Sequence, residues 1–259
     1  MPRGPAQARR RQRELAERLA RGEPVATTEM AERLDVNPMT IRRDLEALER
    51  SGLAVRCYGG AVPARRISFE FAFDERHRQR LESKRRIGNA AAGRVRGNQT
   101  VFLDTGTTTL ETARALAGRG VPFSAVTSSL VIASELWGRD AVDLLLLGGR
   151  VRNGSPDLAG PATEVLLDRL TAHVAFLGSD GVDPERGFFA EDLETARVSE
   201  RMVANAERVV VVADSSKLGR AGGVRFARRE EVDEIITDRE AARSVIASLR
   251  RAGVMVTAV

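Results

Sequence analysis

The chain of 259 residues has few of the residues that build metal centres and disulfide-stabilised folds. It contains one cysteine, Cys57, and two histidines, His77 and His173. A single cysteine excludes an internal disulfide and a cysteine-based metal cluster, and two histidines are too few for a histidine-rich metal site. We therefore expect neither a metal ion nor another cofactor.

Long apolar segments are also missing. No apolar run reaches the roughly 18 residues that a membrane-spanning helix needs. The N-terminal segment MPRGPAQARRRQR is basic, but no apolar core follows it, which argues against a secretory signal. With an ordinary globular composition, 42% hydrophobic and 30% charged, the chain is expected to be cytoplasmic and to make no membrane contact.

Lysine is scarce, because the basic residues are 39 arginines and two lysines, Lys84 and Lys217. The compact lysine ammonium does not replace the planar arginine guanidinium. The two lysines are therefore candidates for specific roles.

The net charge of +5 is unevenly distributed. Residues 1–66 contain 14 Arg against nine Asp and Glu, whereas the remaining residues contain 27 basic and 27 acidic side chains. A basic segment joined to a neutral one is typical of a nucleic-acid-binding module. An arginine-rich exposed surface is the alternative, and charge alone does not decide between them.

The basic segment has the pattern of a helix-turn-helix. Apolar spacing predicts helices over residues 9–20 and from Thr27 or Thr28, as N-cap, to Leu34. A third helix is expected from Pro38 to about Ser51, capped by Asn37. Its apolar stripe consists of Ile41, Leu45 and Leu48, and Gly52 is expected to end it.

The third helix opens on polar and basic residues, as a DNA recognition helix does. Two short strands, 53–57 and 61–62, around Gly59-Gly60 predict a hairpin that serves as a wing. Asp44 is expected to orient Arg42 or Arg43, since it would repel phosphate. The alternative is a three-helix scaffold for protein contacts. The candidate DNA-binding residues are Thr27, Thr28, Asn37, Met39, Thr40, Arg42, Arg43, Arg56 and Tyr58.

The stretch TTEMAERLDVNPMTIRRDLEALERSGLAVRCYGGAV resembles the DNA-binding domain of the DeoR/GlpR family of bacterial repressors, above all in TIRRDL…LE…G…GGA. The family commonly has Ser where Asn37 stands. The resemblance implies a winged helix-turn-helix over residues 7–62, followed by a charged linker over 63–83.

From residue 84 onward, apolar strands alternate with helices, which predicts a mostly parallel α/β sheet. The expected helices are 87–95, 110–117, 130–137, 162–170, 193–206 and 240–251. The expected strands are 100–103, 123–127, 142–147, 174–178, 209–213, 234–237 and 254–257.

Polar or glycine-containing clusters follow five of these strands, where parallel α/β sheets bind ligands. They are residues 104–109, 127–129, 148–150, 178–183 (expected to begin the fifth crossover) and 213–217. In the first, Gly106 lets backbone N–H groups approach a ligand at a helix N-terminus, which favours an anion. We therefore expect a phosphate-binding loop that lacks the ending of a Walker motif. Helix capping explains any one cluster alone.

The segments K84…I87…AA, TVFLDTGTTT, VTSSLVIASEL, LLGGRVR, LAGP, AFLGSDGVD and VVVVADSSKLGR resemble the DeoR-type sensor domain, and through it sugar-phosphate isomerases. The family usually has Asn where Ser128 stands. The resemblance implies effector binding by Lys84, Asp104, Thr105, Gly106, Thr107, Thr108, Thr127, Ser128, Ser129, Gly149, Asp180, Asp183, Glu194 and Lys217.

An isomerase is the rival hypothesis, with Glu194 as a candidate base. The isomerases carry a lysine and a glycine-rich stretch after the DGxD motif, whereas here residues 184–189 read PERGFF. We therefore expect binding without turnover. A DNA-binding protein whose second domain only oligomerises is the third possibility.

The sequence thus predicts an α/β fold class: a winged helix-turn-helix followed by an effector-sensing and oligomerisation domain over residues 84–259. The expected function is repression of a carbohydrate-metabolism operon, and the expected assembly is a dimer or tetramer. Its expected partners are double-stranded operator DNA and a phosphorylated sugar or related effector.

Overall fold

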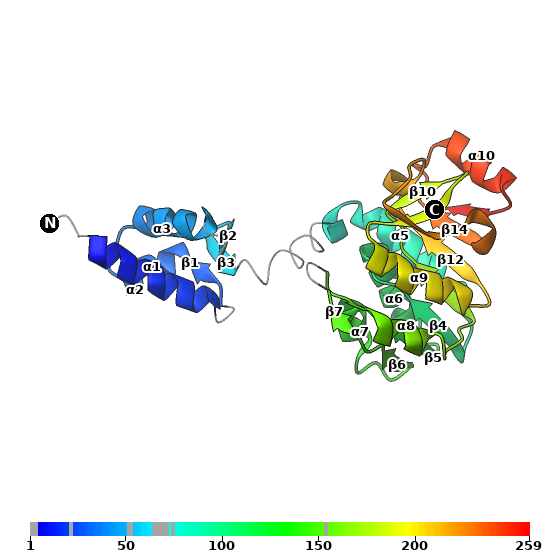
Figure 1. The fold of residues 1–259 in the computed structure, drawn as a ribbon, viewed down its shortest axis with the longest axis horizontal. Coiled ribbons are helices and arrows are strands. Elements are labelled where there is room, and N and C mark those ends of the chain that lie inside the picture. Colours follow the sequence, from blue (N-terminus) through cyan, green and yellow to red (C-terminus); the bar gives the residue numbers. More distant parts are fainter. Residues whose placement is uncertain (1–4, 21–22, 51–53, 64–72, 74–75, 153–154) are drawn as a thin grey trace. The chain divides into compact units, whose positions relative to one another are not determined.

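The structure is a computed structural model that describes residues 5–20, 23–50, 54–63, 73, 76–152 and 155–259. The chain divides into two compact units, Met1–Ala72 and Phe73–Val259, which we call the head and the α/β unit (Figure 1). No helix in the described part of the chain is long and apolar enough to cross a membrane.

The head contains three helices and a small sheet within its described residues. They are α1 (Pro5–Ala20), β1 (Val25–Ala26), α2 (Thr27–Arg33), α3 (Pro38–Arg50), β2 (Ala54–Cys57) and β3 (Gly60–Pro63). The predicted cap of α3 is confirmed, because the backbone N–H of Met39 donates to Asn37 Oδ1 at 2.8 Å. The predicted stop at Gly52 lies outside the described residues.

Apolar residues at helical spacing form the core of the head, as the periodicity predicts. Its fully or almost fully buried side chains include Leu15, Leu19, Met30, Ile41, Leu45 and Leu48. The cap of α2 differs from the prediction: Ala26 is the N-cap and makes no side-chain bond, and Thr27 is already helical and buried.

The wing has one strand more than the hairpin predicted from the sequence. β2 and β3 pair antiparallel, and β1 pairs with the other side of β3. Gly59 has a φ of +85°, which favours glycine, and a Cβ on Gly60 would lie 1.9 Å from the carbonyl oxygen of Val25. The two glycines therefore serve different needs, a tight turn and the close approach of β1.

Asp44 does not orient an arginine of its own helix, so that prediction is wrong. Its side chain is buried and accepts hydrogen bonds from Arg11 Nε and, at 2.8 Å, from Gln12 Nε2, both on α1. A buried carboxylate requires such partners. Asp44 therefore ties α3 to α1.

The α/β unit alternates helices and strands, with shorter elements between them. The first half comprises α5 (Leu81–Ala92), β4 (Gln99–Leu103), α6 (Thr107–Gly118), β5 (Phe123–Thr127), α7 (Leu130–Leu136), β6 (Val142–Leu146), β7 (Arg150–Val151), β8 (Leu158–Ala159) and α8 (Pro161–Leu167). The second half comprises β9 (Val174–Leu177), β10 (Gly181–Asp183), β11 (Gly187–Ala190), α9 (Leu193–Ala204), β12 (Val209–Val212), the 3-10 turn η1 (Ser215–Lys217), β13 (Val224–Ala227), the 3-10 turn η2 (Arg229–Glu231), β14 (Glu234–Thr237), α10 (Arg243–Arg251) and β15 (Met255–Ala258).

Seven parallel strands form the main sheet in the order β15-β14-β12-β9-β4-β5-β6. The parallel sheet is thus confirmed. The chain runs from β4 through β5 to β6, then returns to β9 beside β4 and continues in the opposite direction. Such a reversal creates a crevice at the carboxyl ends of the two central strands, where open α/β sheets bind ligands.

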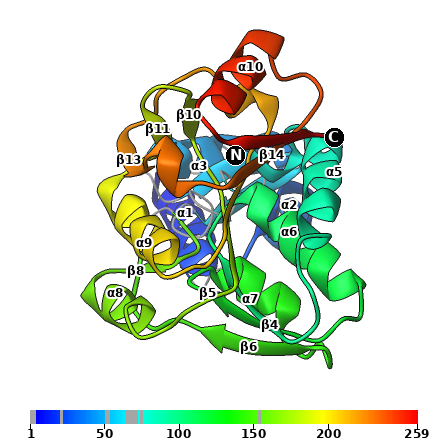
Figure 2. The same ribbon diagram turned by 90° about the vertical axis from the view of Figure 1, so that its right-hand side faces the viewer.

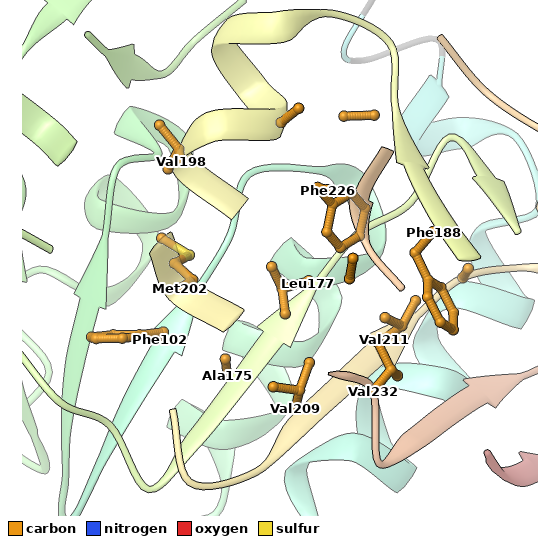
Figure 3. Close-up of a cluster of buried hydrophobic side chains, with 14 of the residues drawn as sticks. Phe102, Ala175, Leu177, Phe188, Val198, Met202, Val209, Val211, Phe226 and Val232 are labelled. Atoms are coloured by element: carbon orange, nitrogen blue, oxygen red, sulfur yellow. The ribbon is translucent and has the colours of Figure 1, made fainter. Parts of the chain in front are cut away.

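Both faces of the central strands are covered, which explains why β9 and β12 are apolar and buried at every position. One face carries α5, α6 and α7, the other α8 and α9 (Figure 2). On the α9 side, Phe102, Ala175 and Leu177 of the sheet lie in one cluster with Val198 and Met202 of α9 (Figure 3).

Two predictions of local structure are corrected here. The crossover expected to begin at 178–183 contains more than the helix predicted at 193–206, because Gly181–Asp183 forms β10 of a separate antiparallel sheet, β10-β11-β13. The helix expected at 87–95 begins at Leu81, inside the stretch expected as linker, and Phe73 is already buried in the core of the α/β unit.

Candidate functional site

The exposed side of α3 presents the predicted recognition residues. Arg42 and Arg43 are exposed, Met39 is 51% exposed, and Asn37 lies exposed at the start of the helix. Thr40 is partly buried. This helix start can therefore offer two guanidinium groups to phosphates or base edges, while its other side packs in the core.

The wing residues and the two threonines of α2 differ in their exposure and in the contacts that they make within the head. Tyr58 is fully exposed at the turn. Arg56 is engaged within the head, because its Nη1 donates to Glu46 Oε1 and its backbone N–H to Glu49 Oε1, each at 3.0 Å. Thr28 is exposed, but the buried side chain of Thr27 does not reach the surface.

A cavity of about 900 Å³ lies in the α/β unit at the crevice between β4 and β9. Its floor is formed by residues that directly follow β4, β9 and β12. Its walls are contributed by the segment before α5, the N-terminal turns of α6 and α9, and η1. The cavity is therefore built from segments distant in sequence that the strand order brings together.

The turn from β4 to α6 has the glycine and the helix N-terminus that the sequence predicts. Gly106 is the N-cap of α6 with a φ of +136°, a conformation that glycine adopts without strain. Because no side chain caps this helix, the N–H groups of Thr107 and Thr108 begin it beside the cavity. A helix N-terminus in this position favours a negatively charged ligand group.

Asp104 lies at the bottom of the cavity with 2% of its surface exposed. Burial raises the pKa of its carboxyl to about 7. The backbone N–H groups of Thr105 and Gly178 have the opposite effect on this pKa, but burial outweighs them. Its Oδ2 accepts from Gly178 N at 3.3 Å. Its Oδ1 and the Oγ1 of Thr109 have no hydrogen-bond partner among the described residues. Buried unpaired oxygens of this kind are open to a ligand or water.

Both lysines of the chain line the cavity. Lys84 Nζ lies 3.8 Å from Asp214 Oδ2, and Lys217 Nζ lies 3.7 Å from Asp180 Oδ1. Burial lowers the pKa of Lys84, and Lys217 and Arg80 lower it further, while Asp214 opposes them. Neither ammonium is in hydrogen-bond contact with its carboxylate, so both can serve an anion.

Arg152 belongs to the cavity wall, although sequence reasoning did not single it out. Its Nη1 donates to Asp192 Oδ1 at 2.6 Å, and its Nε donates to Asp157 Oδ1 at 3.0 Å. Burial alone would lower the pKa of this guanidinium, but the bonds to Asp192 and Asp157 raise it. The signal available in the sequence was the second arginine of the motif LLGGRVR, which follows a strand-end glycine pair.

The structure brings nine of the fourteen predicted effector residues to the cavity: Lys84, Asp104, Thr105, Gly106, Thr107, Thr108, Asp180, Glu194 and Lys217. Among them Glu194 is paired with Arg150. Further lining residues that the prediction missed include Arg76, Gln79, Arg80, Arg152, Ser179, Asp192 and Asp214. Of these, Ser179 and Asp214 lie within strand-end clusters that the sequence does reveal, 178–183 and 213–217.

The other five predicted effector residues do not line the cavity: Thr127, Ser128, Ser129, Gly149 and Asp183. Residues 127–129 are fully buried. Leu130 N donates to Pro156 O, and Leu158 N donates to Ser128 O. Ser129 Oγ caps α7. The segment around β8 thus covers the end of β5.

Packing and turn formation explain the remaining two residues. A Cβ on Gly149 would lie 2.2 Å from Thr163 Oγ1, so this glycine permits the close approach of α8. Asp183 Oδ1 accepts the backbone N–H groups of Glu185 and Arg186 in the turn after β10.

Two known domain families match the chain. Residues 11–66 match the DeoR-like helix-turn-helix domain, and residues 79–239 match the DeoR C-terminal sensor domain. The α/β unit is also similar to ribose 5-phosphate isomerase A from Neisseria gonorrhoeae, at 19% identity over 52% of each chain with a TM-score of 0.38. A likeness of this size carries no argument about function.

Several relatives are similar along most of the chain. The transcriptional regulator GlpR of Haloferax volcanii is 38% identical over 88% of this chain and 89% of its own. A putative aga operon transcriptional repressor of Escherichia coli O157:H7 is 34% identical over 95% and 92%. The glycerol-3-phosphate regulon repressor of Escherichia coli K12 is 31% identical over 83% and 84%. Since the matches extend through both units, the chain belongs to the DeoR family of helix-turn-helix transcriptional regulators.

Proposed function

We propose that this regulator represses a carbohydrate-metabolism operon and that a phosphorylated sugar or related metabolite, bound in the cavity, relieves the repression. The observation that carries the proposal is the cavity at the β4–β9 crevice, where an uncapped helix N-terminus and two lysines meet in a chain with an exposed recognition helix. Of three relatives, one is named as a transcriptional regulator, one as a putative repressor of the aga operon and one as the repressor of the glycerol-3-phosphate regulon.

The polar groups of the cavity fit a ligand with an anionic end and a hydroxyl-bearing body. The start of α6, with Thr107 and Thr108, and the ammonium of Lys217 suit a phosphate. Carboxylates such as Asp180, together with the unpaired oxygen of Asp104, suit sugar hydroxyls.

We infer that the cavity binds its ligand without turning it over. Glu194, the candidate base, is held in an ion pair with Arg150, and its side chain is 43% exposed. A base that abstracts a carbon-bound proton works best in a site that excludes water. Incubation with ribose 5-phosphate, followed by proton NMR, should therefore show no isomerisation. Ketose formation at an enzymatic rate would revive the isomerase hypothesis.

We also propose that the protein acts as a homo-oligomer. A single head covers one operator half-site, and paired heads read repeated or palindromic half-sites with the affinity that repression needs. Sedimentation equilibrium of the full chain tests this. A dimer or tetramer is expected at micromolar concentration, and a monomer that stays monomeric on DNA would contradict it.

A thermal-shift screen of the full chain tests the proposed ligand class. The probes are ribose 5-phosphate, fructose 1-phosphate, fructose 6-phosphate and glycerol 3-phosphate, each beside its unphosphorylated partner and inorganic phosphate. A ligand at about 100 times its dissociation constant stabilises the folded unit by about 2.7 kcal/mol. A shift with a phosphorylated compound and not with its partner is expected. Equal shifts with the unphosphorylated partners would contradict the proposal.

A further inference from the structure

The ammonium of Lys84 connects the cavity to the segment that precedes α5. Lys84 lies near the start of α5, lines the cavity and is only 4% exposed. Its Nζ donates to the carbonyl oxygen of Arg76 at 2.9 Å and to that of Gln79. A ligand-facing cation therefore holds main-chain atoms of residues 76–80, which we call the lead-in segment.

The lead-in segment lies between Phe73, where the α/β unit begins, and α5. Arg76, Gln79 and Arg80 themselves line the cavity. Arg80 is held with a φ of +53°, a left-handed conformation that a non-glycine residue keeps only when its surroundings fix it. Its Nη1 donates to Ser215 Oγ and to Glu240 Oε2, each at 2.8 Å. The segment thus depends on side-chain contacts made around the cavity.

The hydrogen-bond acceptors of the buried Lys84 ammonium carry no negative charge. Both are neutral carbonyls, and the nearest carboxylate, Asp214, stands 3.8 Å away, beyond hydrogen-bond distance. The ammonium already makes charge-assisted bonds to these carbonyls, but a phosphate adds a full opposite charge, and the Coulomb attraction between the two charges strengthens the bond further. A phosphate in the cavity is therefore a better acceptor for this ammonium than the carbonyls that hold it.

We propose that Lys84 is the positioning residue through which an anionic ligand controls the lead-in segment: the anion takes Nζ from the carbonyls of Arg76 and Gln79, and the segment loosens. The inference rests on the proposed function, which supplies a phosphorylated ligand, and it states how occupancy of the cavity reaches the chain that leads to the head. Lys217 lines the same cavity and makes no such bond to the lead-in segment within the described structure.

Trypsin measures the looseness of this segment directly, because Arg76, Arg78 and Arg80 are cleavage sites within it. The experiment compares the full wild-type chain with its Lys84→Met and Lys217→Met variants without ligand, and the wild type with Lys84→Met in a saturating sugar phosphate from the screen. Mass spectrometry follows the fragments that begin at residues 77, 79 and 81. When cleavage is slow, its rate reports the equilibrium population of the open segment.

Without ligand, Lys84→Met should cleave at these sites about tenfold faster than the wild type, the equivalent of one hydrogen bond to a charged group. Lys217→Met should cleave at the wild-type rate. With ligand bound, the wild type should cleave about tenfold faster than without it, whereas Lys84→Met should not respond. Lys217→Met serves only in the ligand-free comparison, because Lys217 belongs to the proposed phosphate site. Unchanged or slower cleavage in the liganded wild type would overturn the proposal. This comparison uses the wild-type protein alone, so it does not depend on whether a variant folds.

Failure of the proposed function and failure of the Lys84 inference give different experimental results. If none of the sugar phosphates binds, the ligand proposal fails, while the ligand-free comparison of the two variants still tests the hold of Lys84 on the segment. Equal cleavage of both variants, with melting temperatures matching the wild type, would overturn that hold. Binding without any change at residues 76–80 would sink the inference and leave the proposed function intact.

Discussion

Asp104 carries the charge in the cavity that is most sensitive to pH near neutrality. Its pKa in the folded chain, about 7 because of burial, exceeds the ordinary value of about 3.9 that it has when unfolded. Between these values the folded state binds the extra proton, so the free energy of unfolding falls as pH rises through the window. The loss is complete about one pH unit above 7, where the carboxyl is ionised in the folded state as well.

The substitution Asp104→Asn tests this assignment, because the amide keeps the shape and cannot ionise. Melting temperatures of the full chain measured from pH 5 to pH 8 should fall with pH for the wild type. The variant should lose that part of the slope and match or exceed the wild type at pH 8. Parallel profiles for the two proteins would show that Asp104 stays ionised throughout.

Individual site residues were predictable from sequence only in part. The strand-end clusters at 104–109 and 178–180 were recognisable because polar residues directly follow buried apolar runs. Thr127, Ser128 and Ser129 have the same pattern, but the end of β5 lies outside the β4–β9 crevice and the segment around β8 covers it. The order of the strands in the sheet and the segments that cover their ends decide which clusters can contact a ligand. Neither can be read from the apolar periodicity of the sequence.

At the scale of elements, the contact between α1 and α3 depends on one buried carboxylate. Asp44 of α3 faces Arg11, whose side chain is only 11% exposed. Removing one partner of a buried ion pair leaves an uncompensated charge, which costs about 3 kcal/mol or more. By contrast, an exposed pair such as Glu46 with Arg56 contributes less than about 1 kcal/mol.

Asp44→Asn should therefore lower the melting temperature of the head in the full chain by about 10 °C or more. The matched substitution Glu46→Gln on the same helix should change it little. Differential scanning calorimetry resolves the transition of the head from that of the α/β unit. Similar effects of the two substitutions would mean that the Asp44 contacts contribute no more than surface charge.

The long elements of the fold were predictable because each buries a regular apolar pattern. β5 and β14 have the predicted limits, and α3 has the predicted cap. The two-residue strands β1, β7 and β8 were not predicted, because two residues show no period. The antiparallel sheet β10-β11-β13 was missed for a related reason: its strands are only three or four residues long, and pairing between segments distant in the sequence defines them.

At the scale of the whole molecule, operator binding and ligand binding should be separable by mutation. Arg43→Ala removes an exposed cation of the recognition helix and should weaken operator binding by about 1–3 kcal/mol without affecting the ligand. Lys217→Ala should weaken ligand binding and leave the affinity for operator unchanged. Fluorescence anisotropy with an operator selected from random DNA, and calorimetry with the ligand, measure the two effects. A reversal of the two phenotypes would refute the assignment of both sites.

The most direct measurement is the operator affinity of the full wild-type chain with and without a saturating sugar phosphate identified by thermal shift, at fixed salt. The bound metabolite should weaken operator binding by a factor of about 5–150, and operator DNA should weaken metabolite binding by the same factor, since coupling between two sites is reciprocal. Equal operator affinity in the presence and absence of the bound metabolite would contradict the proposed sensor.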